Sequence, residues 1–419
     1  MALIVQKFGG TSMADPNRIC ESAKRVKREL DRGNQVVVAV SAMKGETDRL
    51  LNLGMAINPR AGADCPREMD MLASTGEQVS IALMAIALNS MGYDSISLTG
   101  RQVGVYTDGA FMKAKITNIT ADRVKRELAE GKVVVVAGFQ GMDPNDDVTT
   151  MGRGASDLTA VAISAALKAD RCDIYTDVDG VYAADPRIVP QAKKLPVISY
   201  EEMLEMASAG AKVLHTRAVE LAAKYNVKVK VLSSFDELPE DITVDLPGTI
   251  ITSEPDSIRE DVLVSSIQRT TNEAKVTLVD VADRPGTAAK IFQLLADYSV
   301  VVDMIVQNVG AGGKADLSFT VERPDLVRIK KIEDQIKELV GAQDVLYDDK
   351  ISKISAIGVG MRTHAGVAAR MFDALGKRGI NIMMISTSEI KISVVIGEEY
   401  TELAVRTLCD EFHLTESTN

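Results

Sequence analysis

The chain contains 419 residues, which is too long for a single hydrophobic core, so two or three domains are expected. Apolar residues make up 46% and charged residues 26% of the sequence, proportions that are typical of a globular protein. The net charge of -11 repels nucleic-acid phosphates over most of the surface and argues against a nucleic-acid partner.

Membrane segments and protein-bound metals have little support in the sequence. The longest strongly apolar stretch, around Ile81 to Leu88, is less than half as long as a bilayer span. No signal-peptide pattern precedes Lys7, and the four cysteines form neither a CxxC pair nor a metal-ligand spacing. We therefore expect a cytoplasmic protein with reduced thiols, no membrane partner and no metal ligands of its own.

Apolar strands alternate with helices in the first half of the chain. A strand at Ala2 to Phe8, a helix that opens at Asp15-Pro16, and a strand at Gln35 to Val40 form a β-α-β unit. Because the strands are continuously apolar, we expect a mainly parallel sheet with helices on both faces. Further helices are predicted at 68–91, 121–130 and 157–169. Further strands are predicted at 95–98, 133–136, 173–176 and 227–232.

A polar, proline-containing stretch with Pro239, Pro247 and Pro255 then indicates a linker. Beyond it, GTAAKIF at Gly286 and GVAARMF at Gly366 form an internal repeat, and each copy lies between two short predicted strands. Two copies are too few for a solenoid, so they predict one small α/β module in duplicate. The expected domains are 1–236 (large α/β), 237–260 (linker), 261–342 and 343–419 (small modules that pack together).

Three turns in the large domain follow predicted strands and suit anion binding. They are KFGG at Lys7, GRGASD at Gly152 and TDVDGVY at Thr176. Glycines let a phosphate approach the backbone, and helix N-termini favour negative charge. Each turn alone could be only a tight corner or a capped helix start, but ligands of open α/β sheets bind at the carboxyl ends of strands, where all three turns are expected. Neither a P-loop nor a Rossmann glycine pattern is present.

Further polar residues could line the same site. A buried Glu77 facing an ammonium group, together with Arg153 facing a carboxylate, would select an amino acid. Ser41 and Thr47 could add hydroxyl contacts, and Ser156 could cap the helix that follows. The alternative is that each of them is a helix cap or a surface residue.

Histidine is scarce, which limits the chemistry. His215, His364 and His413 are the only three, so a histidine-based triad or zinc site has little to work with. A kinase that phosphorylates a carboxylate does not need them, because its acceptor is already an anion and requires no general base.

The large domain contains, in chain order, the segments KFGGTS, VSAM, STGE, GFQG, GRGASD, TDVDGVYAADPR, AKVLH and PGTII, and the tail contains DRPG and STSEIKISV. In this order, the segments resemble the aspartate kinases of the amino-acid kinase family. The duplicated tail resembles tandem ACT modules, which are small ligand-binding βαββαβ units. The resemblance implies the amino-acid kinase fold, a mainly parallel sheet flanked by helices, followed by two ACT modules.

By resemblance, the activity is ATP-dependent phosphorylation of L-aspartate to 4-phospho-L-aspartate, the first step towards lysine, threonine and methionine, with Mg²⁺ carried by the nucleotide. Lys7 would stabilise the transferred phosphoryl group and Asp157 would organise the charges around it. The implied aspartate-binding residues are Ser41, Thr47, Glu77, Arg153 and Ser156. The implied ATP-binding residues are Lys7, Phe8, Gly9, Gly10, Thr176, Asp177, Tyr182, Arg187 and Lys212.

One position departs from the family pattern. The family turn is usually GRGGSD, and Ala155 replaces its last glycine. Alanine tolerates positive φ poorly, so either the turn avoids that conformation at this position or its geometry differs.

Regulation also follows from the resemblance. ACT modules pair across subunits, which implies a homo-oligomer, dimer or tetramer, that binds lysine, threonine or both at the pairing surface. The chain ends directly after the second copy, so we expect no fused homoserine dehydrogenase. The implied effector-binding residues are Asp283, Gly286, Thr287, Ala288, Gln307, Asn308, Asn381, Ile382 and Thr387.

Two alternatives stay open. The kinase fold could act on another acceptor, such as glutamate, carbamate or a nucleotide, or the chain could be an amino-acid sensor with a silent catalytic domain. The sequence also leaves open which effector binds which ACT copy and whether inhibition is concerted.

Overall fold

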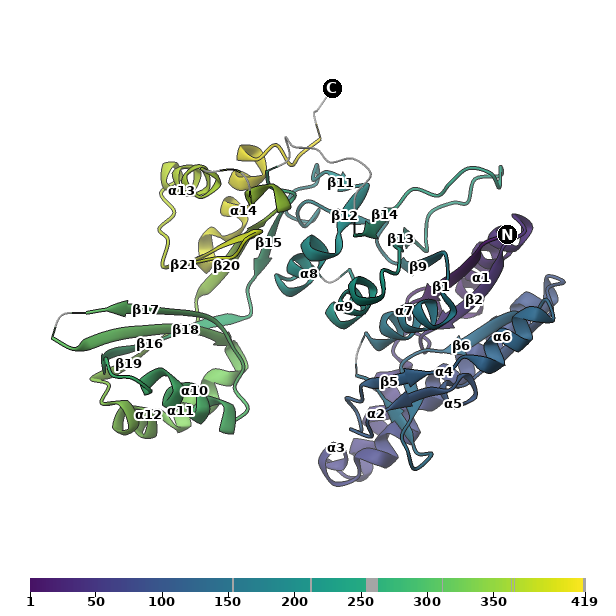
Figure 1. The fold of residues 1–419 in the computed structure, drawn as a ribbon, viewed down its shortest axis with the longest axis horizontal. Coiled ribbons are helices and arrows are strands. Elements are labelled where there is room, and N and C mark those ends of the chain that lie inside the picture. The colour runs from purple at the N-terminus through teal and green to yellow at the C-terminus, as the bar shows by residue number, and fades with distance from the viewer. Residues whose placement is uncertain are drawn as a thin grey trace. The chain divides into compact units, whose positions relative to one another are not determined.

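The computed structural model describes residues 1–152, 154–211, 213–253, 263–310, 312–362, 364 and 366–416. The chain forms two compact units, and many of their elements are labelled in Figure 1. The N-terminal unit comprises 1–181, 194–208 and 212–258, and the C-terminal unit comprises 182–193, 209–211 and 259–419.

An eight-stranded sheet forms the centre of the N-terminal unit. Every neighbouring pair with a defined register is parallel except β13 with β14, so the predicted mainly parallel sheet is confirmed. The strands, in spatial order, are β12 (Val197–Ser199), β14 (Thr249–Thr252), β13 (Val229–Ser233), β9 (Arg171–Thr176), β1 (Leu3–Phe8), β2 (Gln35–Val40), β6 (Val133–Ala137) and β3 (Ser95–Leu98).

Strand β1 lies at the point where the strand order changes direction. The chain continues from β1 to β2 on one side, whereas β9 and β13 add to the other side. Phe8 pairs with Val40 on one side and Tyr175 on the other, so the carboxyl ends of β1, β2 and β9 are level. In open α/β sheets such a reversal leaves a crevice for a ligand at the carboxyl ends.

The two faces of the sheet separate Lys7 from Phe8, because successive side chains in a strand point to opposite faces. Phe8 is fully buried in the core cluster that also contains residues of α1 (Pro16–Asp31) and α4 (Pro66–Ser90). Lys7 points to the other face, where α7 (Ala155–Leu167) packs against β1, β2 and β9. Helix α9 (Thr216–Tyr225) packs beside α7.

Helix α4 has the length and mean hydropathy of a membrane span, and it is the one such helix among the described residues. Of an apolar 18-residue stretch of this helix, 56% is buried inside the protein. The buried residues of the whole helix include Asp70 and Glu77. Helix α4 is therefore a long core helix that carries two buried carboxyl groups.

A smaller four-stranded sheet, which no sequence pattern predicted, lies beside α4 in the same unit. Its strands, in spatial order, are β5 (Ile116–Ile119), β4 (Val105–Thr107), β7 (Gln140–Met142) and β8 (Val148–Thr150). The other elements of the unit are α2 (Glu46–Ile57), α3 (Ala61–Asp64), α5 (Gly100–Val103), α6 (Asp122–Ala129), β11 (Lys194–Leu195) and α8 (Tyr200–Ser208).

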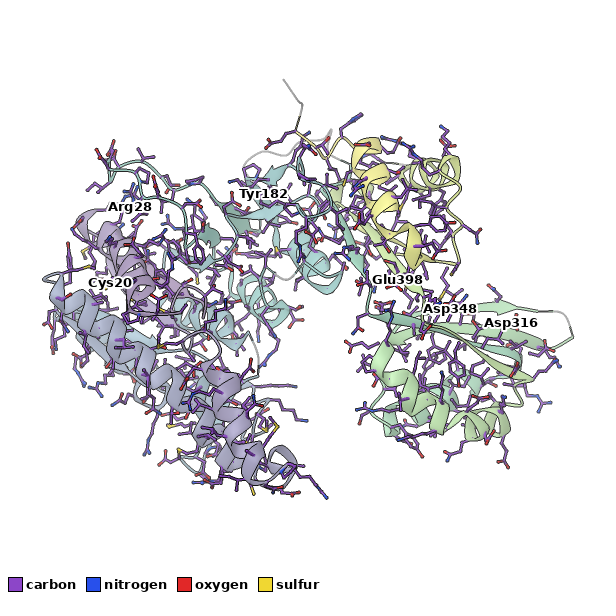
Figure 2. The ribbon with its side chains drawn as sticks, turned by 180° about the vertical axis from the view of Figure 1, so that it is seen from behind. Cys20, Arg28, Tyr182, Asp316, Asp348 and Glu398 are labelled. Carbon is purple, nitrogen blue, oxygen red and sulfur yellow. The ribbon has the colours of Figure 1, made fainter. Side chains whose placement is uncertain are left out.

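The stretch predicted as a linker, 237–260, is partly built into the N-terminal unit. Arg28 of α1, labelled in Figure 2, donates hydrogen bonds to the carbonyl oxygens of Pro239, Asp241 and Val244 at 2.7–2.8 Å. Strand β14 then joins the central sheet beside β13. The sequence did not predict that this stretch belongs to the N-terminal unit. A polar segment with prolines has the same sequence pattern whether or not its carbonyl groups accept hydrogen bonds from a distant arginine.

Two small sheets form the C-terminal unit. The first has the order β17 (Val302–Val309), β18 (Lys314–Glu322), β16 (Glu273–Ala282) and β19 (Asp344–Asp348). The second has the order β21 (Met384–Thr387), β22 (Lys391–Gly397), β20 (Ile351–Ile357) and β15 (Ser266–Thr270). The helices are α10 (Thr287–Asp297), α11 (Leu326–Lys331), α12 (Glu333–Val340), α13 (Val367–Lys377) and α14 (Thr401–Glu411).

The internal repeat is visible in these elements. Gly286 and Gly366 are the N-caps of α10 and α13, the corresponding helices of the two copies. Strand β15 takes the place in the second sheet that β19 takes in the first, although β15 lies within 261–342, the range predicted for the first copy, and β19 lies within 343–419. The boundaries at 261–342 and 343–419 stay predictions; the sheets add that each copy is completed by a strand from outside its repeated core.

The two sheets contact each other through their edge strands β17 and β21. Met304 of β17 packs in one apolar cluster with Ile351 and Met384. Beside it, Lys353 of β20 forms ion pairs with Glu273 and Asp303 of the first copy. Apolar contacts and charges thus link the two copies within one chain.

The segment 182–193 also belongs to the C-terminal unit. The N–H of Ile267 donates to the carbonyl oxygen of Ala183 at 2.7 Å, and the Arg406 guanidinium donates to that of Ile188 at 3.1 Å.

Candidate active site

A buried ion pair lies at the carboxyl end of β1. Lys7 Nζ is 2.6 Å from Asp157 Oδ1, and the two side chains are 11% and 10% exposed. Asp157 Oδ1 is buried and has no hydrogen-bond partner among the described residues, so the contact is an ion pair. Asp157 stands in the first turn of α7, whose packing on β1 brings it to Lys7.

The glycines after Lys7 keep the space around its ammonium open. A Cβ atom on Gly9 would lie 3.3 Å from Lys7 Nζ, and one on Gly10 would lie 3.3 Å from the carbonyl oxygen of Ala42. The chain then turns, with the N–H of Ser12 donating to the Gly9 carbonyl oxygen, before Asp15 caps α1. Glycine thus leaves room at two points where the backbone of this corner approaches other groups.

The backbone of the GRGASD turn explains why alanine is tolerated at position 155. Positive φ falls on Gly152 (83°) and Gly154 (76°), whereas Ala155 is already the first residue of α7 and has no positive φ. Alanine is therefore compatible with this turn. Gly154, not Ser156, is the N-cap of α7, so the suggested capping role of Ser156 is wrong. Instead, buried Ser156 packs so closely against Gly138 that a Cβ there would lie 2.8 Å from its side chain.

Glu77 is a buried carboxyl with one oxygen to spare. Its Oε1 accepts a hydrogen bond from the N–H of Ala42 at 2.9 Å, and its Oε2 has no hydrogen-bond partner among the residues that the structure describes. Burial raises the pKa of this carboxyl to about 7, with the Ala42 N–H opposing the shift. Ser41 follows β2 directly, and half-buried Thr47 lies in the first turn of α2. The loop that carries Ser41 is thus tied to Glu77.

The expected nucleotide residues have different positions. Phe8 is fully buried and stacked on Tyr175 with ring centroids 4.8 Å apart, so only its backbone is available to a ligand. Thr176 ends β9 next to Lys7's strand, and exposed Asp177 follows it. Arg153 and Lys212 lie outside the described residues.

Two further expected nucleotide residues, Tyr182 and Arg187, belong to the C-terminal unit. Exposed Arg187 is paired with Asp185, whose oxygens accept from its guanidinium at 2.8 and 3.0 Å. Tyr182 is half-buried in the short strand β10 (Val181–Tyr182).

The expected effector residues fall into two sets. One set surrounds the start of α10, where the Thr287 hydroxyl donates to the Ala282 carbonyl oxygen and exposed Asp283 precedes the helix. The other set lies on or next to the edge strands β17 and β21, which contact each other. The first set is Asp283, Gly286, Thr287 and Ala288, and the second is Gln307, Asn308, Asn381, Ile382 and Thr387.

Some residues that shape this region had no sequence prediction. Gln140 donates to the carbonyl oxygen of Ser74 at 2.9 Å, which ties β7 to α4. Asp70 lies two helical turns before Glu77 and is buried on the same helix. Acidic residues seven apart on an otherwise apolar helix are the signal that could have indicated Asp70.

Comparisons with known proteins bear on this arrangement. A model of the amino acid kinase family matches residues 2–233, and models of the ACT domain match 275–341 and 354–412. An aspartate kinase of Pseudomonas fluorescens is 52% identical over 414 residues, which cover 99% of this chain and 98% of that protein. The chain belongs to the aspartate kinase family.

Solved structures agree with this membership. E. coli aspartokinase III in complex with aspartate and ADP matches this aspartate kinase with a TM-score of 0.80 and 26% identity, over 98% of this chain and 99% of that one. The same enzyme in complex with lysine and aspartate matches with a TM-score of 0.77 and 26% identity, over 99% and 100%. The reaction is phosphorylation of aspartate, which decides against a silent sensor and against another acceptor.

The raised pKa of Glu77 predicts a pH-dependent stability of the aspartate-free kinase. The pKa is about 7 in the folded protein against an ordinary value of 4.5, so the folded state binds this proton more tightly than the unfolded state. Acid therefore favours the fold, and ionisation of Glu77 destabilises it progressively as the pH rises through this window. At about 1.4 kcal/mol per pKa unit, the full effect is on the order of 3 kcal/mol.

Urea unfolding of the wild type and of Glu77→Gln, from about pH 5 to about pH 8, measures this effect. We expect the variant to gain stability relative to the wild type as the pH rises, while Glu68→Gln, an exposed carboxylate on the same helix, does not. A stability difference between Glu77→Gln and wild type that is constant with pH would contradict the raised pKa.

Proposed function

We propose that phosphoryl transfer takes place beside Lys7, at the carboxyl end of β1. The single observation that carries this proposal is the buried Lys7–Asp157 ion pair at the reversal of strand order. Lys7 neutralises charge on the transferred group, and Asp157 holds the ammonium in place before the nucleotide arrives. An ammonium with one carboxylate partner keeps donors for phosphate oxygens.

Aspartate binds between Glu77 and the GRGASD turn. The unpaired Oε2 of Glu77 accepts from the substrate ammonium, which satisfies the buried oxygen. Arg153 pairs with a substrate carboxylate, since its guanidinium matches carboxylate geometry. Ser41, Thr47 and Ser156 contribute hydroxyl groups to the same substrate, and the first two are supported by their positions after β2 and at the start of α2.

The reaction needs no histidine base, because the acceptor carboxylate is already ionised. The position of His215 supports this view. Its Nδ1 accepts from the N–H of Arg217 at 3.3 Å, and its ring lies so close to Gly154 that a Cβ there would be 2.6 Å away. His215 thus supports the start of α9 and packs against the turn.

ATP is the phosphoryl donor, and Mg²⁺ arrives with it. The backbone of Lys7 to Gly10, together with Thr176, Asp177 and Lys212, contacts the nucleotide; Tyr182 and Arg187 come from the segment 182–193. Among the described residues, no group of three or more His, Cys, Asp or Glu side chains could hold a metal ion. This composition fits Mg²⁺, which is usually held by phosphates and water with one or two carboxylates.

Lysine, threonine or both regulate the enzyme through the ACT modules, as feedback on their biosynthesis. The contact between β17 and β21 and the lysine complex of the E. coli relative support this. Effectors shift a two-state equilibrium of the C-terminal unit. Because the segment 182–193 is hydrogen-bonded within that unit, a rearrangement there acts directly on Tyr182 and Arg187. The enzyme is a cytoplasmic homo-oligomer, a dimer or tetramer, that assembles through its ACT modules.

Removing the charge of Lys7 should stop catalysis. We expect Lys7→Met to lower kcat by at least about 10²–10³-fold, the usual cost of losing one donor to a developing charge. Because the substitution leaves Asp157 buried and unpaired, the double variant Lys7→Met with Asp157→Asn separates catalysis from folding. The double variant should unfold near the wild-type urea midpoint and stay inactive, whereas exposed Lys24→Ala should keep full activity. Near-normal turnover by a folded Lys7→Met protein would refute the role of Lys7.

Effector control is tested by titrating aspartate-dependent ATP consumption with lysine and threonine, singly and together. We expect at least one combination to lower activity at millimolar concentration. Asn308→Ala, on edge strand β17, should weaken the inhibition, while Gln293→Ala, an exposed amide on α10, should not. Activity that is unchanged under all three conditions would count decisively against feedback by these amino acids.

A further inference from the structure

The GRGASD turn starts from two segments that lie side by side. The N–H of Ala114 donates to the carbonyl oxygen of Thr150 at 2.9 Å, and a Cβ on Gly152 would lie 3.6 Å from the carbonyl oxygen of Met112. We name residues 112–114 and 149–151 the ledge. Strand β8 ends on the ledge at Thr150, two residues before Gly152.

Asp70 fastens the ledge from the side of α4. Its Oδ2 accepts from the N–H groups of Met112 at 2.9 Å and Thr150 at 2.8 Å, and its Oδ1 accepts from the Thr150 hydroxyl at 2.5 Å. The side chain is 1% exposed, and burial raises the pKa of this carboxyl above its ordinary value. Three hydrogen bonds accepted by one buried side chain fix both segments of the ledge to one helix.

Arg217 fastens the ledge from the side of α9. Its guanidinium donates to the carbonyl oxygen of Met151 at 2.9 Å and to that of Ala114 at 3.1 Å. Asp70 thus accepts hydrogen bonds from N–H groups of the two segments, and Arg217 donates hydrogen bonds to carbonyl oxygens of the same two segments. Both side chains bond directly to the ledge, and both stand on helices.

We propose that Asp70 and Arg217 are positioning residues for the aspartate substrate, which act by holding the ledge and with it the turn that begins at Gly152. This inference rests on the proposed function, in which that turn and Glu77 bind aspartate. Asp70 and Glu77 stand seven residues apart on α4, two turns along the same side. Helix α4 therefore sets both the place of Glu77 and, through Asp70, the place of the turn.

The test compares variants that break the contacts with variants that keep them. Asp70→Ala removes all three acceptors, whereas the amide of Asp70→Asn can accept both N–H groups through its oxygen and donate to the Thr150 hydroxyl. Arg217→Met keeps the apolar stem and loses both donors, whereas Arg217→Lys keeps the charge and reaches one carbonyl. Each is measured for the KM of aspartate, kcat, ADP affinity and the urea midpoint.

We expect Asp70→Ala and Arg217→Met to raise the KM for aspartate at least tenfold at unchanged ADP affinity, and Asp70→Asn to stay within about twofold of the wild type. Arg217→Lys should lie between Arg217→Met and the wild type. If Asp70→Ala does not fold, Arg217→Met decides alone. Aspartate and ADP affinity falling together, or an unchanged aspartate KM in folded variants, would overturn the positioning role.

Arg153→Ala distinguishes this inference from the function on which it rests. If Arg153→Ala leaves the KM for aspartate unchanged, the turn does not bind aspartate, and the positioning role falls with it. If Arg153→Ala raises the KM while Asp70→Ala and Arg217→Met leave it unchanged, only the positioning role is overturned.

Discussion

The ion pair between Lys7 and Asp157 is the interaction on which the arrangement of this site depends. A buried charge is costly without its partner, so the register of β1 and the starting point of α7 must agree. Such a pair is a weak source of stability, since the cost of removing two charges from water offsets their attraction. Its value lies in placing one ammonium group where the order of the strands reverses and three strand ends are level.

Helix α4 gives the site its second fixed point. It presents Glu77, one of whose oxygens is unpaired among the described residues, and in the same unit it holds the small sheet through Asp70 and the Ser74 carbonyl. Cation and carboxylate are thus anchored on opposite faces of one sheet, by α7 and α4 respectively. Fixed charges of this kind lower the cost of reorganisation during phosphoryl transfer, which is where an enzyme without a general base gains its rate.

The sequence predicted what local patterns determine. Apolar runs gave the parallel strands, and the glycine turns marked their carboxyl ends. Long-range pairing was not visible: β15 completes a sheet whose other strands begin at Ile351, and the short β7 and β8 contain glycine and threonine rather than apolar runs. Asp70 and Arg217 escaped notice because they bind backbone groups, which any sequence at the partner positions would supply. The roles of the predicted site residues themselves stay predictions.

The most direct test of this account is a crystal structure of the enzyme with aspartate, Mg²⁺ and a non-hydrolysable ATP analogue. The account predicts the terminal phosphate within hydrogen-bond distance of Lys7 Nζ, about 2.7–3.2 Å, with the aspartate ammonium on Glu77 Oε2. A terminal phosphate bound away from Lys7, with the Lys7–Asp157 pair facing no ligand, would contradict it.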